Sequence, residues 1–311
     1  MTDFWHFFLL SAPLFAVVLA GYVIACIPRW RREWTEIATK FVFAVALPAM
    51  LFHLMSDLSK LPPVDARLLI AFFGGCFIVF AIGRLVAARM FRLDGVGQSV
   101  FALGGVFSNN VLLGVPLTKL TLGEKAIPSV ALVLVFNALT LWTLVTVSVE
   151  WARHGSLTVA GFGKTALNVL KNPIVASILL GTAFGLSGLP MPRSIDAVLS
   201  FIGQLAAPAA LLALGMGLAQ YGVRREWNRS LAICLLKLVV QPLTVWLLAI
   251  ALGLPDIERN AVVLLASMAV GANVYLMAVQ FDTLQGAIAS SLVLSTALAA
   301  LTTPLLLAAL R

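Results

Sequence analysis

Long apolar runs alternate with short polar links along the whole chain. A helix needs about 20 consecutive apolar residues to cross the hydrocarbon core of a bilayer. Ten runs reach that length, at roughly 5–27, 37–55, 67–89, 98–117, 127–149, 173–190, 197–221, 230–253, 260–280 and 285–310. We therefore predict an all-α polytopic membrane protein with ten transmembrane helices.

The composition of the 311 residues supports this prediction and excludes other classes. Hydrophobic residues make up 61% and charged residues 11%, against roughly 45–50% and 25% in soluble domains. Such a chain cannot cover a soluble fold with polar surface, so a soluble enzyme and a disordered chain are excluded. A β-barrel would show alternating segments of about ten residues instead. The net charge of +8 lies mainly in short links, where it orients helices, so we expect no nucleic-acid partner.

Lysine and arginine are more frequent in the links after the first, third, fifth, seventh and ninth runs than on the opposite side. The richer set is Arg29, Arg31, Arg32, Arg89, Arg92, Arg153, Lys164, Lys171, Arg224, Arg225 and Arg229, and the poorer set is Lys60, Arg67, Lys119, Lys125, Arg193, Arg259 and Arg311. Cytoplasmic loops carry the excess of positive charge. We expect both termini outside and the 151–172 link in the cytoplasm.

Proline positions indicate an internal repeat. Pro13 recurs 160 residues later as Pro173, and Pro48 recurs at the same offset as Pro208. Because each half holds five runs, the second half must be inserted upside down. The predicted units are a first five-helix repeat at 1–150, a cytoplasmic link at 151–172 and an inverted repeat at 173–311. Inverted repeats are typical of alternating-access transporters, whose substrate lies near the midplane.

Two polar segments, 107–117 and 268–281, fall in the middle of the fourth and ninth runs. Each combines Asn with Gly, at Asn110 and Asn273 among others. Interrupted helices free backbone groups that need protein, water or ligand partners, and half-helix N-termini attract anions. The alternative is that these small residues only let helices pack closely.

These two segments resemble those of the auxin efflux carrier family. Further matching segments, in family order, lie at 46–52, 170–190, 207–215 and 236–242. The resemblance implies two inverted five-helix repeats, with helices four and nine broken and crossing and an organic anion bound beside the crossing. It also implies a distant relation to bile acid:sodium symporters and favours a homodimer. The short 151–172 link resembles the bacterial branch, which implies the inner membrane.

The residues of these segments supply the candidate site. The substrate-binding candidates are Asn109, Asn110, Gly114, Asn273, Tyr275, Gln280 and Lys237, and the helix-break candidates are Pro48, Pro116, Pro208 and Gly271. Family members often carry a helix-nine proline where this chain has Ala269, so the ninth-helix break is expected to rest on Gly271.

Lys237 lies eight residues past Arg229, which is about 12 Å along a helix and so near mid-membrane. A buried cation there is costly and is by default a functional candidate. Two interpretations stay open: the ammonium attracts an anion, or it is a structural group bonded to helix ends.

No Asp or Glu lies in the middle of any run, which argues against a carboxylate proton relay. The chain also lacks a Gly-rich nucleotide loop and a clustered metal or nucleophile set, so we expect no cofactor, no metal and no enzyme. The predicted function is a carrier of small organic anions, such as malonate-like or auxin-like acids. We expect uniport driven by the gradient and the membrane potential, with a sodium- or proton-coupled symporter as the alternative.

Overall fold

The computed structural model describes residues 2–56, 65–154, 173–221 and 226–310. All regular structure in these ranges is helical apart from one isolated β-bridge, so the all-α prediction is confirmed. Within the described ranges, seven helices are long and apolar enough to cross a membrane, which makes the chain a multi-pass membrane protein. Most of the predicted link, at 155–172, lies outside the described residues, as do Lys60, Arg224, Arg225 and Arg311.

The helices follow the predicted runs. They are α1 (Thr2–Cys26), α2 (Arg32–Phe41), α3 (Leu47–Ser56), α4 (Arg67–Met90), α5 (Gly95–Val106), α6 (Val115–Thr121), α7 (Ile127–His154), α9 (Pro173–Leu186), α10 (Arg193–Tyr221), α11 (Trp227–Leu235), α12 (Gln241–Ala251), α13 (Asp256–Ala266), α14 (Asn273–Gln280) and α15 (Gln285–Ala309). Three of the connections are π-helical: η1 (Val42–Ala46) joins α2 to α3, η3 (Asn110–Gly114) leads into α6, and η5 (Leu236–Val240) joins α11 to α12. The 3₁₀ segment η4 (Glu124–Ala126) leads into α7.

Three predicted runs contain only shorter helices. The run at 98–117 contains α5 and α6, the run at 173–190 contains α9, and the run at 260–280 contains α13 and α14. None of these helices exceeds 14 residues. The count of ten membrane-crossing helices and their inverted arrangement therefore stay predictions.

Each of the three π-helical segments ends two residues before a proline, at Pro48, Pro116 and Pro242. A proline lacks the N–H that would bond to the carbonyl four residues earlier, and its ring clashes with that carbonyl. Widening the helix at that carbonyl accommodates the ring without ending the helix. Pro208 behaves differently, because α10 runs through it as a continuous helix. The helix is therefore not broken at Pro208, nor at Pro48 or Pro116, where it continues out of the π-helical segment. Tertiary contacts in a membrane bundle allow a helix to tolerate a proline, and of the four predicted helix-break residues only Gly271 lies in an interruption.

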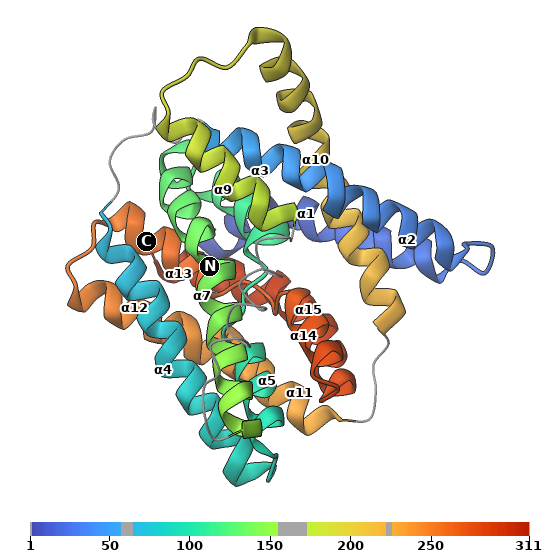
Figure 1. The fold of residues 1–311 in the computed structure, drawn as a ribbon, viewed down its shortest axis with the longest axis vertical. Coiled ribbons are helices and arrows are strands. Elements are labelled where there is room, and N and C mark those ends of the chain that lie inside the picture. Colours follow the sequence, from blue (N-terminus) through green and yellow to red (C-terminus); the bar gives the residue numbers. More distant parts are fainter. Residues whose placement is uncertain (1, 57–64, 155–172, 222–225, 311) are drawn as a thin grey trace.

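The helices pack in two groups (Figure 1). In one, α1 and α3 pack against α10, and α9 packs against α3. In the other, α4 packs against α5 and α12, while α13 packs against α12 and α15 against α11. The contacts of α1 with α15 and of α7 with α9 join the groups. Each group therefore takes helices from both halves of the chain.

Candidate functional site

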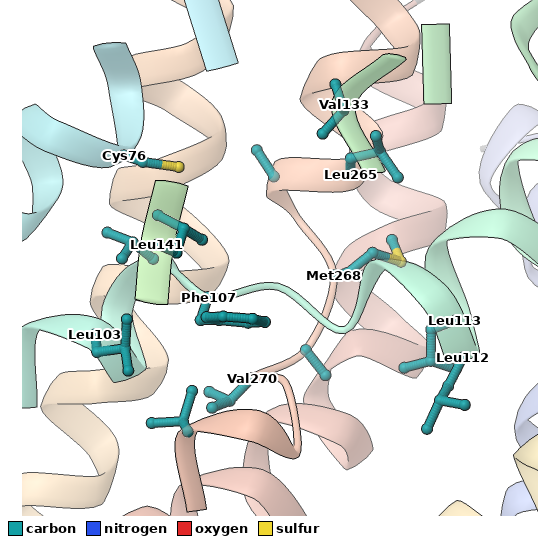
Figure 2. Close-up of a cluster of buried hydrophobic side chains, with 14 of the residues drawn as sticks. Cys76, Leu103, Phe107, Leu112, Leu113, Val133, Leu141, Leu265, Met268 and Val270 are labelled. Atoms are coloured by element: carbon teal, nitrogen blue, oxygen red, sulfur yellow. The ribbon is translucent and has the colours of Figure 1, made fainter. Parts of the chain in front are cut away.

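Two short non-helical segments cross each other and pair through an isolated β-bridge between Ser108 and Val270. Residues 107–109 separate α5 from η3, and residues 267–272 separate α13 from α14. The backbone N–H of Asn109 donates to the carbonyl of Ala269 at 2.8 Å, and the N–H of Gly271 donates to the carbonyl of Phe107 at 2.8 Å. Figure 2 shows the two segments passing each other between the helix ends, beside the Phe107 ring. Each interruption therefore supplies backbone partners that the other needs in an apolar interior.

Gly271 allows this close approach. A Cβ at that position would lie 2.9 Å from Cδ1 of Phe107 and 3.1 Å from the carbonyl oxygen of Ser108. Both neighbours belong to the crossing segment, and one of them is backbone. The interruption at 267–272 contains no proline, and Gly271 is the residue that brings the crossing segment within hydrogen-bond reach.

A small cavity of about 50 Å³ lies at the crossing. Its lining consists of Leu47, Phe107, Ser108, Asn109, Asn110, Val111, Leu112, Leu134, Asn137, Ile178, Gly271, Ala272 and Asn273. The structure thus brings Asn109, Asn110 and Asn273 together from segments about 160 residues apart. Asn137, which α7 adds to the same lining, was not among the predicted substrate-binding residues. A mid-span amide was the available signal, but a sequence does not show which face of α7 meets the crossing.

Several polar atoms around this cavity have no hydrogen-bond partner among the described residues. They are Oγ of Ser108, Nδ2 of Asn109, Nδ2 and Oδ1 of Asn110, and Oδ1 of Asn137. These four side chains are all at least nine-tenths buried. An unsatisfied buried polar group costs about 1–3 kcal/mol, and an amide offers donors on one side and an acceptor on the other. Such a cluster is typical of a site that a polar ligand completes.

Two half-helices begin at the cavity. One runs without interruption through η3 and α6 from Asn110, and α14 begins at Asn273. A helix N-terminus carries a partial positive charge of about half an elementary charge. The residues that line the cavity include no Asp, Glu, Lys or Arg. The site therefore combines amide donors with a positive field and suits an anion.

Other candidates from the sequence lie beside the cavity and do not line it. Gly114 serves close packing, because a Cβ there would lie 2.8 Å from Cδ2 of Leu265. Tyr275 is half-buried in α14, and Gln280 is exposed at the end of the same helix. A substrate-binding role for these three residues remains a prediction.

Lys237 lies behind the crossing. It is fully buried in η5, and its Nζ donates to Oε1 of Gln241 at 2.6 Å and to the carbonyl of Ala266. Gln241 in turn donates from Nε2 to the carbonyl of Val106 at 2.9 Å and to Sγ of Cys76 at 3.3 Å. Val106 and Ala266 are the last residues of α5 and α13. This geometry corresponds to the second interpretation above, a lysine bonded to helix ends.

A wider cavity of about 460 Å³ lies along the same helices. Its lining includes Met50 of α3, Pro116 and Lys119 of α6, Ile127 of α7 and Gln204 of α10. Met50 is about one turn from Leu47, which lines the small cavity. His53 in this lining bonds through Nε2 to Oδ1 of Asp196 at 2.9 Å. The wide cavity and the small cavity therefore both take lining residues from α3 and α7.

Within the described ranges, no three His, Cys, Asp or Glu side chains gather as a metal site would require.

The profile of the Mem_trans family, described as "Membrane transport protein", matches residues 6–307. A Rhizobium meliloti (strain 1021) protein described as "Putative malonate transporter" is 27% identical over 298 residues, which cover 94% of this chain and 92% of that protein. These matches confirm the resemblance to the auxin efflux carriers.

Proposed function

Because this chain belongs to the Mem_trans family of membrane transport proteins, and is therefore a transporter and not an enzyme, we propose that it carries small organic anions across the inner membrane by alternating access. Malonate-like dicarboxylates are the first choice of substrate. The class also includes auxin-like acids.

The observation that carries this proposal is the cavity at the crossing. Unpartnered Asn109 and Asn110 amides and two helix N-termini meet there, and the lining holds no carboxylate. Buried amide donors in one cavity whose lining carries no negative charge favour a carboxylate oxygen over a cation or a neutral apolar molecule.

The size of the cavity favours a small acid. One water needs about 10–15 Å³ of comparable volume, so a cavity of about 50 Å³ holds only a few heavy atoms. Malonate suits this volume better than an indole acid does. The name of the Rhizobium relative points to the same substrate class.

The architecture we propose is two inverted five-helix repeats, at 1–150 and 173–311, with both termini outside and the link in the cytoplasm. The recurrence of Pro13 and Pro48 at an offset of 160 and the pairing of the two interrupted segments support it. A homodimer is part of the proposal on the family resemblance alone.

For energy coupling we propose uniport. The cavity lining contains no Asp or Glu that would carry a proton or bind sodium strongly. The alternative is a sodium- or proton-coupled symporter, in which backbone carbonyls and amides at the crossing would hold the sodium ion.

The test is uptake of radiolabelled malonate into proteoliposomes. We expect uptake that saturates with concentration and accelerates when unlabelled malonate is present inside, because a carrier must reorient between turnovers. Asn110→Leu removes an amide from the cavity and should abolish this uptake, while Asn228→Leu, at an exposed position in α11 outside the cavity lining, should preserve it. Uptake that neither saturates nor shows this acceleration would identify a channel, and absence of malonate uptake would rule out this substrate.

A further inference from the structure

Two polar side chains, Lys237 and Gln241, link the C-terminal ends of α5 and α13. Lys237 donates to the carbonyl of Ala266 at the end of α13, and Gln241, one turn later, donates to the carbonyl of Val106 at the end of α5. The two side chains also bond to each other at 2.6 Å. Both are fully buried. A single helix therefore holds the rear of the crossing through one cation and one amide.

The charges at the two sides of the crossing differ in sign. Each half-helix C-terminus carries about half a negative charge, and each N-terminus about half a positive charge. The two C-termini behind the crossing thus sum to about −1, and one ammonium group at Lys237 offsets them. The two N-termini at Asn110 and Asn273 sum to about +1 and face the cavity.

We propose that Lys237 is a positioning residue that strengthens anion binding through the crossing: its ammonium neutralises the two helix C-termini, so that the field of the two N-termini acts on the anion undiminished. The inference depends on one part of the proposed function, namely that an anion binds in this cavity. It assigns Lys237 no contact with the substrate, in contrast to the first interpretation of the sequence.

The separation is short enough for this effect. A chain advances at most about 3.6 Å per residue, so Val106 and Asn110 are no more than about 14 Å apart. At about 12 Å and an effective dielectric constant of about 20, one unit charge changes the binding constant of another by about tenfold. Removing the ammonium should therefore weaken binding by about tenfold for each negative charge on the ligand.

The first experiment compares two ligands of the same shape. Malonate carries two negative charges, and malonamate, in which an amide replaces one carboxylate, carries one. For Lys237→Gln, which keeps an N–H donor and loses the charge, we expect about 100-fold weaker malonate binding and about tenfold weaker malonamate binding. Lys40→Gln, which removes a charge from an exposed position in α2, is the control and should change neither. Equal losses for both ligands, or no loss, would overturn the proposal.

The second experiment does not depend on the substrate. Asn110→Cys places a thiol at the start of the half-helix, in a Cys26→Ser background because Cys26 is the exposed native thiol. The positive field raises the thiolate fraction, which we measure as the reaction rate with methyl methanethiosulfonate at pH 7.5. Lys237→Gln should lower that rate about tenfold. An unchanged rate would overturn the role of Lys237 even if malonate binds, whereas a lowered rate without malonate binding would fault only the proposed substrate.

Loss of folding is a separate outcome that thermal unfolding of each variant detects. Lys237→Met is the second variant for both experiments. Its apolar side chain is close to lysine in length and, like Lys237→Gln, leaves no unpaired charge in the interior. Lys237→Met should show the same losses of malonate and malonamate affinity, and the same fall in the thiol reaction rate, as Lys237→Gln.

Discussion

The backbone N–H of Asn109 donates to the carbonyl of Ala269, 160 residues further along the chain, at 2.8 Å. The reciprocal bond from Gly271 to Phe107 has the same length. Neither interrupted helix can therefore keep its extended segment satisfied without the other. The two breaks form one structural unit, and a change on either side should affect the cavity that both of them build.

Asn110→Leu should separate binding from stability. Both polar atoms of this side chain are buried without a partner in the described part of the chain, so an apolar replacement of similar size removes a desolvation cost of about 1–3 kcal/mol. We expect a melting temperature that is unchanged or higher, together with malonate binding weakened about 10- to 100-fold, which corresponds to a hydrogen bond to a charged ligand. Calorimetry of the purified protein, with and without malonate, measures both.

If Asn110→Leu instead lowered the melting temperature and preserved binding, the amide would be structural. Asn228→Leu provides the control, since this exposed amide of α11 does not line the cavity and its replacement should leave malonate affinity within about twofold of the original.

Gly271→Ala should disrupt the crossing. The new Cβ would lie 2.9 Å from the Phe107 ring and 3.1 Å from the Ser108 carbonyl, and relieving such contacts in a packed interior costs about 1–3 kcal/mol. A lower melting temperature and weaker binding should appear together, because the displaced segment lines the cavity. Gly74→Ala is the matched control, as its Cβ would meet only the Leu248 side chain at an ordinary 3.5 Å. Similar effects in the two variants would show that the crossing tolerates the added methyl group.

The sequence identified the crossing because its signals are local. Asn109, Asn110 and Asn273 stand beside glycines in the middle of apolar runs, where polar groups and helix breakers are costly. The other residues that line the cavity cannot be found from a local pattern. Asn137 reaches the same cavity from α7, and whether that face of α7 points to the crossing depends on how the helices pack.

Lys237 and Pro208 show the same limit. The spacing from Arg229 placed Lys237 near mid-membrane. Its bond to the end of α13, 29 residues away, and the bond of its partner Gln241 to the end of α5, 135 residues away, follow from no local pattern. A proline alone does not end a helix either: Pro48, Pro116 and Pro242 follow π-helical segments, while α10 passes through Pro208.

Gly215→Ala should destabilise the packing of α1 on α10. A Cβ on Gly215 would overlap the carbonyl oxygen of Val18, so one helix must move away from the other. We expect a fall in melting temperature that corresponds to at least about 1–3 kcal/mol. Gly217 lies two residues further in the same helix, and a Cβ there would meet nothing within 4 Å. Gly217→Ala should therefore be neutral or slightly stabilising, and a neutral result for both glycines would contradict the close approach of α1 and α10.

The last prediction concerns energy coupling. The cavity lining holds no Asp or Glu, so transport of an anion should move net charge, and each charge contributes about 2.3 kcal/mol per 100 mV of membrane potential. An inside-negative potential should then oppose malonate uptake and accelerate export, with no need for a sodium or proton gradient. The measurement is malonate flux in proteoliposomes with a potassium–valinomycin potential, in sodium-free buffer at two pH values above the carboxyl range, so that the charge on the substrate stays constant. Flux that ignores the potential, or that stops without sodium, would refute uniport, and a rate that changes with pH under these conditions would indicate proton coupling by the protein itself.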